Sequence, residues 1–183
     1  PFGSHEINPT ESIVNTFPTI LPIKNPFGPG SSEVSIERQI LSVDQKGSIW
    51  TAKELELREW DAILHLGLCG ECTSPRLELL AEDKLDMRIP DNSGRCVTDV
   101  VLSGDGDQAS QLPIKKWGID EWQIEVELSK DAGRFICNET YYRTLEALEN
   151  HKLAIPCLFL HLPSTEHFSS QNATILIRKI LAH

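Results

Sequence analysis

The chain has 183 residues, 40% of them hydrophobic, which is enough for one compact domain with a substantial core. Its 27 acidic and 17 basic side chains give a formal net charge of −10, which disfavours binding to nucleic acid or to an anionic membrane surface. The longest apolar stretches, such as residues 155–162, are far shorter than the roughly 20 residues of a transmembrane helix. We therefore expect a single domain over residues 1–183, with no nucleic-acid partner and no membrane span.

The five cysteines are sparse and odd in number, unlike the dense cysteines of a disulfide-stabilised secreted domain. This usage favours a reducing compartment, and the first residues lack the basic and apolar regions of a signal peptide. We therefore expect a cytoplasmic protein. The sequence begins abruptly, without Met and in a turn-like Pro-Phe-Gly, which indicates that an upstream segment has been lost.

The first third of the chain predicts a loop-dominated start followed by two longer elements. Residues 1–35 are rich in Pro, Gly, Ser and Asn, with a short helix expected over residues 11–20. A strand is predicted at residues 38–43. Thr51 and Glu54 fit a capping box that would begin a helix reaching to about residue 60. Residues 62–68 form an almost continuous apolar run, which predicts a central strand covered on both faces.

The remaining elements alternate between strands and helices. The turn at residues 90–94 separates two mixed segments and predicts a hairpin-like excursion. Apolar periodicity predicts a strand ending at Ser129, with Ile124, Val126 and Leu128 on its buried face. It also predicts a helix over 132–150 and a strand over 155–162. A last helix is predicted over 173–181, capped by Ser169 or Ser170. This alternation predicts a three-layer α/β/α sandwich with a mostly parallel central sheet.

Reactive side chains fall where such sheets place their sites, at the carboxyl ends of strands and the helix N-termini facing them. Cys137 lies in the first turns of the helix that follows the loop at residues 129–133, where the helix dipole favours a thiolate. His161 ends an apolar strand and could act as the base for that sulfur. On spacing alone, a buried helical cysteine and a structural strand histidine are the commoner interpretation. His65 and His5 are interpreted as structural or exposed residues.

Three segments resemble the motifs of one peptidase family. Residues 129–138, Ser-Lys-Asp-Ala-Gly-Arg-Phe-Ile-Cys-Asn, followed by Thr-Tyr-Tyr at 140–142, resemble the nucleophile motif of the pyroglutamyl peptidase I family. Residues 159–163 resemble its histidine segment and residues 76–78 its glutamate segment, in the family's order Glu, Cys, His. Residues 88–92 are similar to its turn after the glutamate strand, and residues 1–3 and 8–10 to its N-terminal substrate loop.

The resemblance covers nearly the whole chain and implies a cysteine exopeptidase that removes N-terminal pyroglutamate from peptides. It implies that Cys137 is the nucleophile, that His161 is the general base and then the acid, and that Glu78 orients the imidazole. The thiolate would attack the pyroglutamyl carbonyl to give a thioester that water hydrolyses. This chemistry requires no metal and no cofactor.

The resemblance also implies how the substrate is held. The ring of Phe2 would pack on the lactam, while main-chain groups near Leu68 and Ile136 would hydrogen-bond the lactam amide. Backbone donors near Cys137 would meet the oxyanion, and Arg88 would add positive charge. The peptide with an N-terminal pyroglutamate is thus the expected partner, and formation of a homo-oligomer stays open.

Some residues depart from the family pattern. The family's first strand would precede residue 1, so we expect residues 1–183 to form this domain without that strand. Leu68 stands where many bacterial relatives have Gln, Leu79 stands where they have Arg, and residues 25–32 form a longer connection. These departures concern the pocket and its access and leave the three catalytic residue types in place.

Two alternatives come from other functional classes. A relative that binds peptides without turnover would result if the missing strand or altered pocket abolished catalysis. A thiol redox protein, or half of a zinc site, would use the CxxC pair Cys69 and Cys72. The chain has no second Cys/His pair with zinc-ligand spacing, and the motif follows a strand and does not clearly open a helix, so the redox and zinc interpretations rank last.

Overall fold

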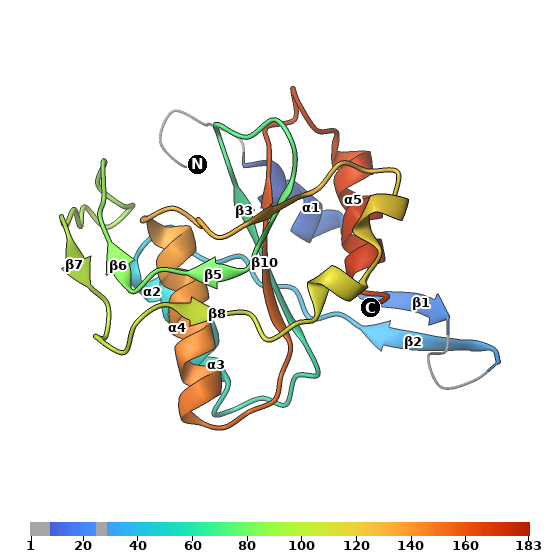
Figure 1. The fold of residues 1–183 in the computed structure, drawn as a ribbon, viewed down its shortest axis with the longest axis horizontal. Helices are drawn as coiled ribbons and strands as arrows, with labels where there is room; N and C mark the ends of the chain where they lie inside the picture. The colour runs from blue at the N-terminus through green and yellow to red at the C-terminus, as the bar shows by residue number, and fades with distance from the viewer. Residues whose placement is uncertain (1–7, 25–28) are drawn as a thin grey trace.

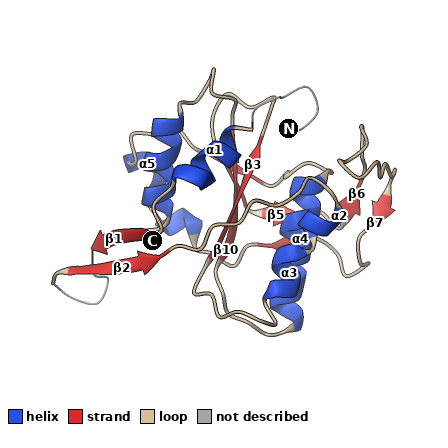
Figure 2. Cartoon of the chain, turned by 180° about the vertical axis from the view of Figure 1, so that it is seen from behind, coloured by secondary structure: helices blue, strands red, loops and turns tan. Residues whose placement is uncertain are grey.

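The computed structural model describes residues 8–24 and 29–183. A four-stranded sheet runs through the molecule, with helices on both sides (Figures 1 and 2). The strands lie in the order β3 (Ile63–Leu68), β10 (Cys157–Leu162), β4 (Arg76–Glu78) and β9 (Glu127–Ser129). β3 and β10 are parallel, as are β4 and β9, whereas β10 and β4 are antiparallel. The predicted mostly parallel α/β architecture is confirmed.

The helices form two layers. On one side lies α4 (Ile136–Asn150) with the short α2 (Gln45–Ser48) and α3 (Trp50–Glu54); on the other lie α1 (Pro9–Thr16) and α5 (Ser170–Ile180) (Figure 1). The remaining elements are short: β1 (Ile20–Lys24), β2 (Ser31–Ser35), β5 (Leu80–Ala81), β6 (Lys84–Leu85), β7 (Val100–Val101), β8 (Gln108–Ala109), η1 (Ile114–Lys116) and η2 (Ile119–Glu121). No helix within the described ranges is long and apolar enough to cross a bilayer.

β10 is buried along its whole length because it separates two hydrophobic clusters. Successive side chains of a strand point to opposite faces. Leu158, Leu160 and Leu162 therefore join the cluster under α1 and α5, and Cys157 and Phe159 join the cluster under α4. A strand covered on both faces loses the alternation of apolar and polar residues, which explains the continuous apolar run of its sequence.

The two long C-terminal helices agree closely with their prediction. α5 begins after Ser169, whose side chain accepts a hydrogen bond from Asn172 N at 3.2 Å. α4 begins at Ile136, four residues later than predicted, because Gly133 adopts a left-handed conformation with φ +77°. Residues 130–135 are consequently a loop leading into the helix.

The strand predicted at residues 38–43 is wrong, because this segment forms no ladder in the structure. Its Arg38 side chain instead donates hydrogen bonds to the carbonyls of Asn15 at 2.9 Å and Phe17 at 2.7 Å, at the end of α1. The extended structure lies earlier, in the antiparallel β1 and β2 hairpin, in a region expected to be mostly loop. Residues 38–43 thus form a connecting segment, in which Ile40 is exposed and Val43 packs beside the cluster of Leu85, Met87 and Ile136.

The helix predicted from Thr51 to residue 60 is also wrong in extent and in its cap. Two short helices form instead, and α3 ends at Glu54. The side-chain cap is Asp44, which accepts a hydrogen bond from Gly47 N at 2.9 Å at the start of α2. Thr51 lies inside α3, where it cannot act as an N-cap.

Two further corrections concern the sheet. β3 was expected to be central, but it lies at one edge of the described sheet, and β10 holds the central place beside it. In β9, the predicted buried face is only partly covered, since Leu128 is 39% exposed. Ile124 and Val126, by contrast, pack against the cluster under α1 and α5.

Candidate active site

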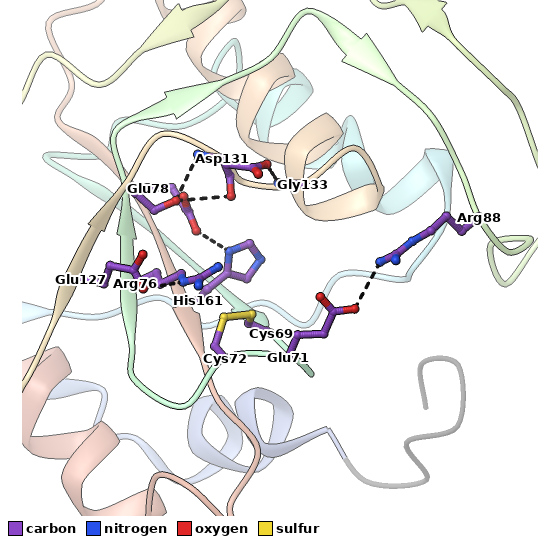
Figure 3. The surroundings of a disulfide bond; sticks show 11 residues. Cys69, Glu71, Cys72, Arg76, Glu78, Arg88, Glu127, Asp131, Gly133 and His161 are labelled. Carbon is purple, nitrogen blue, oxygen red and sulfur yellow. Dashed lines mark hydrogen bonds and ion pairs between the residues drawn. A yellow bond between two sulfur atoms is a disulfide. The ribbon is translucent and has the colours of Figure 1, made fainter.

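Strand parity brings His161 and Glu78 to the face of the sheet that α4 covers. His161 follows Phe159 by two residues, so it shares the face of β10 that packs against α4. Leu77 packs toward α1 and α5, so its neighbour Glu78 points the opposite way. Glu78 Oε1 lies 2.7 Å from His161 Nδ1, and the two side chains face each other in Figure 3.

The Glu78 carboxylate is completely buried, with 0% of the residue exposed. Its Oε1 atom bonds to His161, whereas Oε2 accepts no hydrogen bond from the residues that the structure describes. Burying a carboxylate is costly unless it is paired, so His161 is the group that compensates this charge. Among the described residues, the Glu78 carboxylate therefore has the His161 imidazole as its one hydrogen-bond partner.

Cys137 completes the group from the first turn of α4. It is partly exposed, and its side chain is one of the two groups that raise the pKa of His161. Because Nδ1 faces Glu78, the other ring nitrogen, Nε2, is left for the sulfur. Burial lowers the pKa of His161, but the hydrogen bonds and charges of Cys137 and Glu78 outweigh it and raise this pKa from 6.5 to about 9. The arrangement therefore favours the imidazolium form of His161.

The loop before α4 is held by its own side chains. Ser129 Oγ accepts a hydrogen bond from Asp131 N at 3.0 Å, and Asp131 Oδ1 accepts one from Gly133 N at 3.0 Å. The first hydrogen bond of the helix runs from Glu139 N to Phe135 O. The backbone N–H groups of residues 136–138 thus precede the helical ladder and lie at the positive end of the helix dipole.

Asn138, next to Cys137, was not singled out from the sequence. It is completely buried, and its side-chain oxygen accepts from Glu82 N at 2.8 Å. Its amide nitrogen donates to Glu82 O and Lys84 O, each at 2.9 Å. These bonds fix the first turn of α4 to the segment between β5 and β6. Its position beside the nucleophile was the only available signal.

Sequence reasoning also missed a buried ionic network on the next residue of α4. Arg95 donates to both carboxylate oxygens of Glu139, at 3.0 and 2.6 Å, and to Asp91 Oδ2 at 3.0 Å. Glu139 is 2% exposed and Asp91 6% exposed. Asp91 Oδ1 also accepts from Ser93 N at 2.9 Å, which holds the turn at residues 90–94. The network connects this turn to the helix that carries Cys137.

The His161 imidazole packs closely against the Phe159 ring and the backbone at Gly67. The rings of Phe159 and His161 have centroids 4.7 Å apart. On β3, a Cβ atom at Gly67 would lie 2.7 Å from the Phe159 ring and 3.0 Å from His161 Cδ2. Only glycine fits at this position without moving one of the two rings.

The predicted substrate-binding residues are spread around this group. Ile136 is buried at the start of α4, whereas the Leu68 side chain belongs to the opposite face of the sheet. It lines a cavity of about 260 Å³ with Pro9, Gly70 and residues 164–167. The Arg88 side chain is 89% exposed, and its guanidinium lies 3.7 Å from the Glu71 carboxylate. Phe2 lies outside the described residues.

Cys69 and Cys72 of the CxxC motif are joined by a disulfide (Figure 3), a pairing that the sequence analysis did not predict. The turn brings their Cα atoms to 5.4 Å, inside the usual range for a disulfide. No group of three or more potential metal ligands occurs among the described residues. His65 stays apart from the site, as it is buried, lies 3.0 Å from Thr144 Oγ1, and has its pKa lowered to about 4 by burial.

Comparison with known proteins agrees with this geometry. The sequence model of the pyroglutamyl peptidase family matches residues 1–174. The pyrrolidone-carboxylate peptidase of Fusobacterium nucleatum is 32% identical over 167 residues, which cover 89% of this chain and 74% of that protein. The pyrrolidone-carboxylate peptidase of Streptococcus pyogenes is 30% identical over the same shares of the two chains. The chain belongs to the pyroglutamyl peptidase family.

Solved structures support the same assignment. The pyrrolidone carboxyl peptidase of Fervidobacterium islandicum is 28% identical, with a TM-score of 0.84 over 100% of this chain and 92% of that chain. The enzyme from Pyrococcus furiosus, at 24% identity and a TM-score of 0.84, has the same fold over 99% of this chain and 92% of its own. The resemblance of the sequence motifs to this family is therefore confirmed.

Proposed function

We propose that the protein is a cysteine exopeptidase that hydrolyses the amide bond after an N-terminal pyroglutamate of a peptide. The observation that supports this most strongly is the placement of His161 between Glu78 and Cys137, on one face of the sheet. Family membership supplies the substrate class. Burying a carboxylate against an imidazole costs free energy, and peptide binding without turnover does not need such a pair.

In the proposed mechanism, Cys137 attacks the pyroglutamyl carbonyl as a thiolate. His161 keeps the proton of the sulfur and then gives it to the leaving amine, so that the amide bond breaks and a thioester remains. His161 next takes a proton from water, whose oxygen attacks the thioester and releases pyroglutamate. Glu78 holds Nδ1–H throughout and stabilises the imidazolium, so that Nε2 always faces the reacting atoms.

The oxyanion and the lactam are assigned to backbone groups. The N–H groups at the start of α4 are the donors for the oxyanion, since they lie beside Cys137 and precede the helical ladder. The main chain near Leu68 and Ile136 holds the lactam amide, and Phe2 packs on its ring. Arg88 acts through long-range positive charge, because its side chain is exposed. A pocket of this kind accepts the neutral lactam and disfavours a charged amine.

Release of a fluorogenic amine from its pyroglutamyl amide tests the proposal. We expect turnover by the chain, and a loss of at least about a thousandfold in kcat for Cys137→Ala, which removes the nucleophile. Cys96→Ser is the matched control because Cys96 is a free, exposed cysteine outside the group, and it should keep full activity. An unchanged rate in Cys137→Ala would exclude Cys137 as the nucleophile. No turnover by the unaltered chain would favour the peptide-binding alternative.

A further inference from the structure

The loop at residues 69–75 crosses over the end of the strand that carries His161. β3 and β4 lie on opposite sides of β10, with Leu68 paired to Leu162 and Arg76 paired to His161. A chain that leaves β3 and enters β4 must therefore pass over the carboxyl end of β10. Cys69 N donates to Leu162 O at 2.8 Å, which fixes the start of this crossing.

The loop is longer than the crossing requires. Strands two places apart in a sheet are separated by about 10 Å, whereas seven extended residues reach roughly 23 Å. The excess length would allow several loop paths if nothing restrained it. The disulfide between Cys69 and Cys72 removes part of this freedom by closing a four-residue turn at the start of the loop.

The disulfide also fixes the turn at residues 69–72, which we call the substrate-binding rim because it follows the main chain near Leu68. Figure 3 draws the disulfide below His161 in this view, and the Glu71 side chain reaches toward Arg88. Glu71 lies between the two cysteines and has 86% of its side chain exposed. Gly70, in the same turn, lines the 260 Å³ cavity together with Leu68. The closed turn thus borders both a cavity and the backbone assigned to the lactam.

We propose that Cys69 and Cys72 form a reversible redox site that positions the substrate-binding rim, and that the disulfide form binds pyroglutamyl peptides more tightly than the dithiol form. The inference rests on the proposed function. It concerns binding more than the chemical step, because Glu78, His161 and Cys137 are held by β4, β10 and α4, whose hydrogen bonds do not depend on the bridge.

The reductant is a low-molecular-weight thiol. Cys69 is partly exposed and Cys72 is only 2% exposed, so the attacking thiolate reaches Cys69 Sγ. The sulfur–sulfur bond breaks, and Cys72 leaves as a thiolate and takes a proton. A second thiol attacks the external sulfur of the mixed disulfide, which releases Cys69 as a thiol and the reagent as its disulfide. Two electrons pass from two thiols to the bridge, and oxidation by a small disulfide reverses the steps.

The test measures binding without turnover. In Cys137→Ala, calorimetry gives the Kd of a pyroglutamyl dipeptide before and after treatment with dithiothreitol, and mass spectrometry after alkylation reports the state of Cys69 and Cys72. We expect reduction to raise Kd roughly three- to tenfold, the scale of ordering one or two loop residues on binding. The Cys69→Ser/Cys72→Ser/Cys137→Ala variant should match the reduced protein and should not respond to dithiothreitol.

Three results would overturn the inference. Equal Kd values in the two redox states would show that the disulfide does not affect substrate binding, and the proposed function would still stand. A response of the serine variant to dithiothreitol would assign the effect to another group. Binding in neither state, with the fold retained by circular dichroism, would reject the proposed substrate class and the inference together.

Discussion

His161 is surrounded by groups that favour its charged form. Burial opposes the charge, but the hydrogen bonds and charges of Cys137 and Glu78 raise the pKa of His161 from 6.5 to about 9. At neutral pH the imidazole therefore carries the proton that the leaving amine needs.

This protonation predicts the alkaline side of the pH profile. We expect kcat/KM for a pyroglutamyl amide to fall as pH rises through about 9, because His161 then loses the proton that it gives to the amine. Glu78→Gln should move this decline to lower pH, since it removes a charge that raises the pKa of His161. The measurement is kcat/KM from pH 5 to 10 for both proteins. A decline at the same pH in Glu78→Gln would contradict the assigned role of Glu78.

Gly67 is the residue whose substitution should displace the imidazole without altering any reacting group. In Gly67→Ala the new methyl would press on the Phe159 ring and on His161 Cδ2. We expect destabilisation of about 1–3 kcal/mol, typical of overpacking, and a drop of roughly tenfold to a hundredfold in kcat from misplaced chemistry. Urea unfolding and steady-state kinetics measure the two effects. Full kcat in a destabilised Gly67→Ala would show that the ring of Phe159 moves and His161 does not.

At the scale of elements, α4 is attached to the rest of the molecule by polar contacts along its length. Asn138 binds the segment between β5 and β6, and Tyr141 Oη donates to Glu78 O at 3.0 Å. Glu139 binds Arg95, which also holds the turn at residues 90–94. The helix that carries Cys137 is thus joined directly to the strand that carries Glu78.

Removal of Arg95 tests this attachment. We expect Arg95→Gln to lower the free energy of unfolding by about 3–5 kcal/mol at neutral pH, because two buried carboxylates lose their common partner. Arg58→Gln is the matched control, since Arg58 and its partner Glu37 lie at the surface, and we expect it to lose much less stability. Urea denaturation of both variants decides the matter. Equal losses would mean that the network is not buried in solution.

The same network has a pH dependence with a defined sign. Burial raises the pKa of Asp91, but hydrogen bonds from Ser93 and Arg95 outweigh burial and lower it below 3.8. A lowered folded-state pKa stabilises the fold above the pKa of the unfolded chain, and this stabilisation is lost as pH falls through the folded value. We expect the stability gap between the unaltered chain and Asp91→Asn to narrow below about pH 4. Urea midpoints at pH 7 and pH 3 measure it.

How well each element could be predicted depended on how strongly burial shaped its sequence. β10 and α5 are covered along continuous faces, so their apolar patterns indicated them correctly. The segment at 38–43 has the composition of a strand but forms no ladder, and its Arg38 side chain bonds to carbonyls at the end of α1. Local composition cannot report which strand edges the rest of the chain leaves open.

In the candidate site, too, some residues could be predicted from the sequence and others could not. Glu78, His161 and Cys137 could be located because their motifs resemble a known family, and the structure brings them together. The Arg95 network and the Cys69–Cys72 disulfide had no such signal. Both depend on contacts between separate segments or on the shape of a turn, and a charge or a CxxC spacing alone has many commoner interpretations.

For the whole molecule, the sheet divides the interior into two main clusters, one under α1 and α5 and one under α4. β10 contributes to both, through Leu160 on one face and Phe159 on the other. A large-to-small substitution such as Leu160→Ala should therefore cost about 2–5 kcal/mol, although it points away from the catalytic face. Thermal unfolding checks the loss. The position of His161, one residue along, should shift with the strand and lower kcat as well.

The central place of β10 also has a consequence for the order of folding. Glu78 and His161 are 83 residues apart in the chain, and β10 enters the sheet between two strands that precede it by nearly half of the sequence. Contacts within α4 are local and form quickly, whereas closing so large a loop is slow. After dilution from urea, we expect the helical circular-dichroism signal to recover first and peptidase activity to follow in a later phase. The catalytic group would then be among the last parts of the chain to assemble, so an arrested intermediate would be helical and inactive.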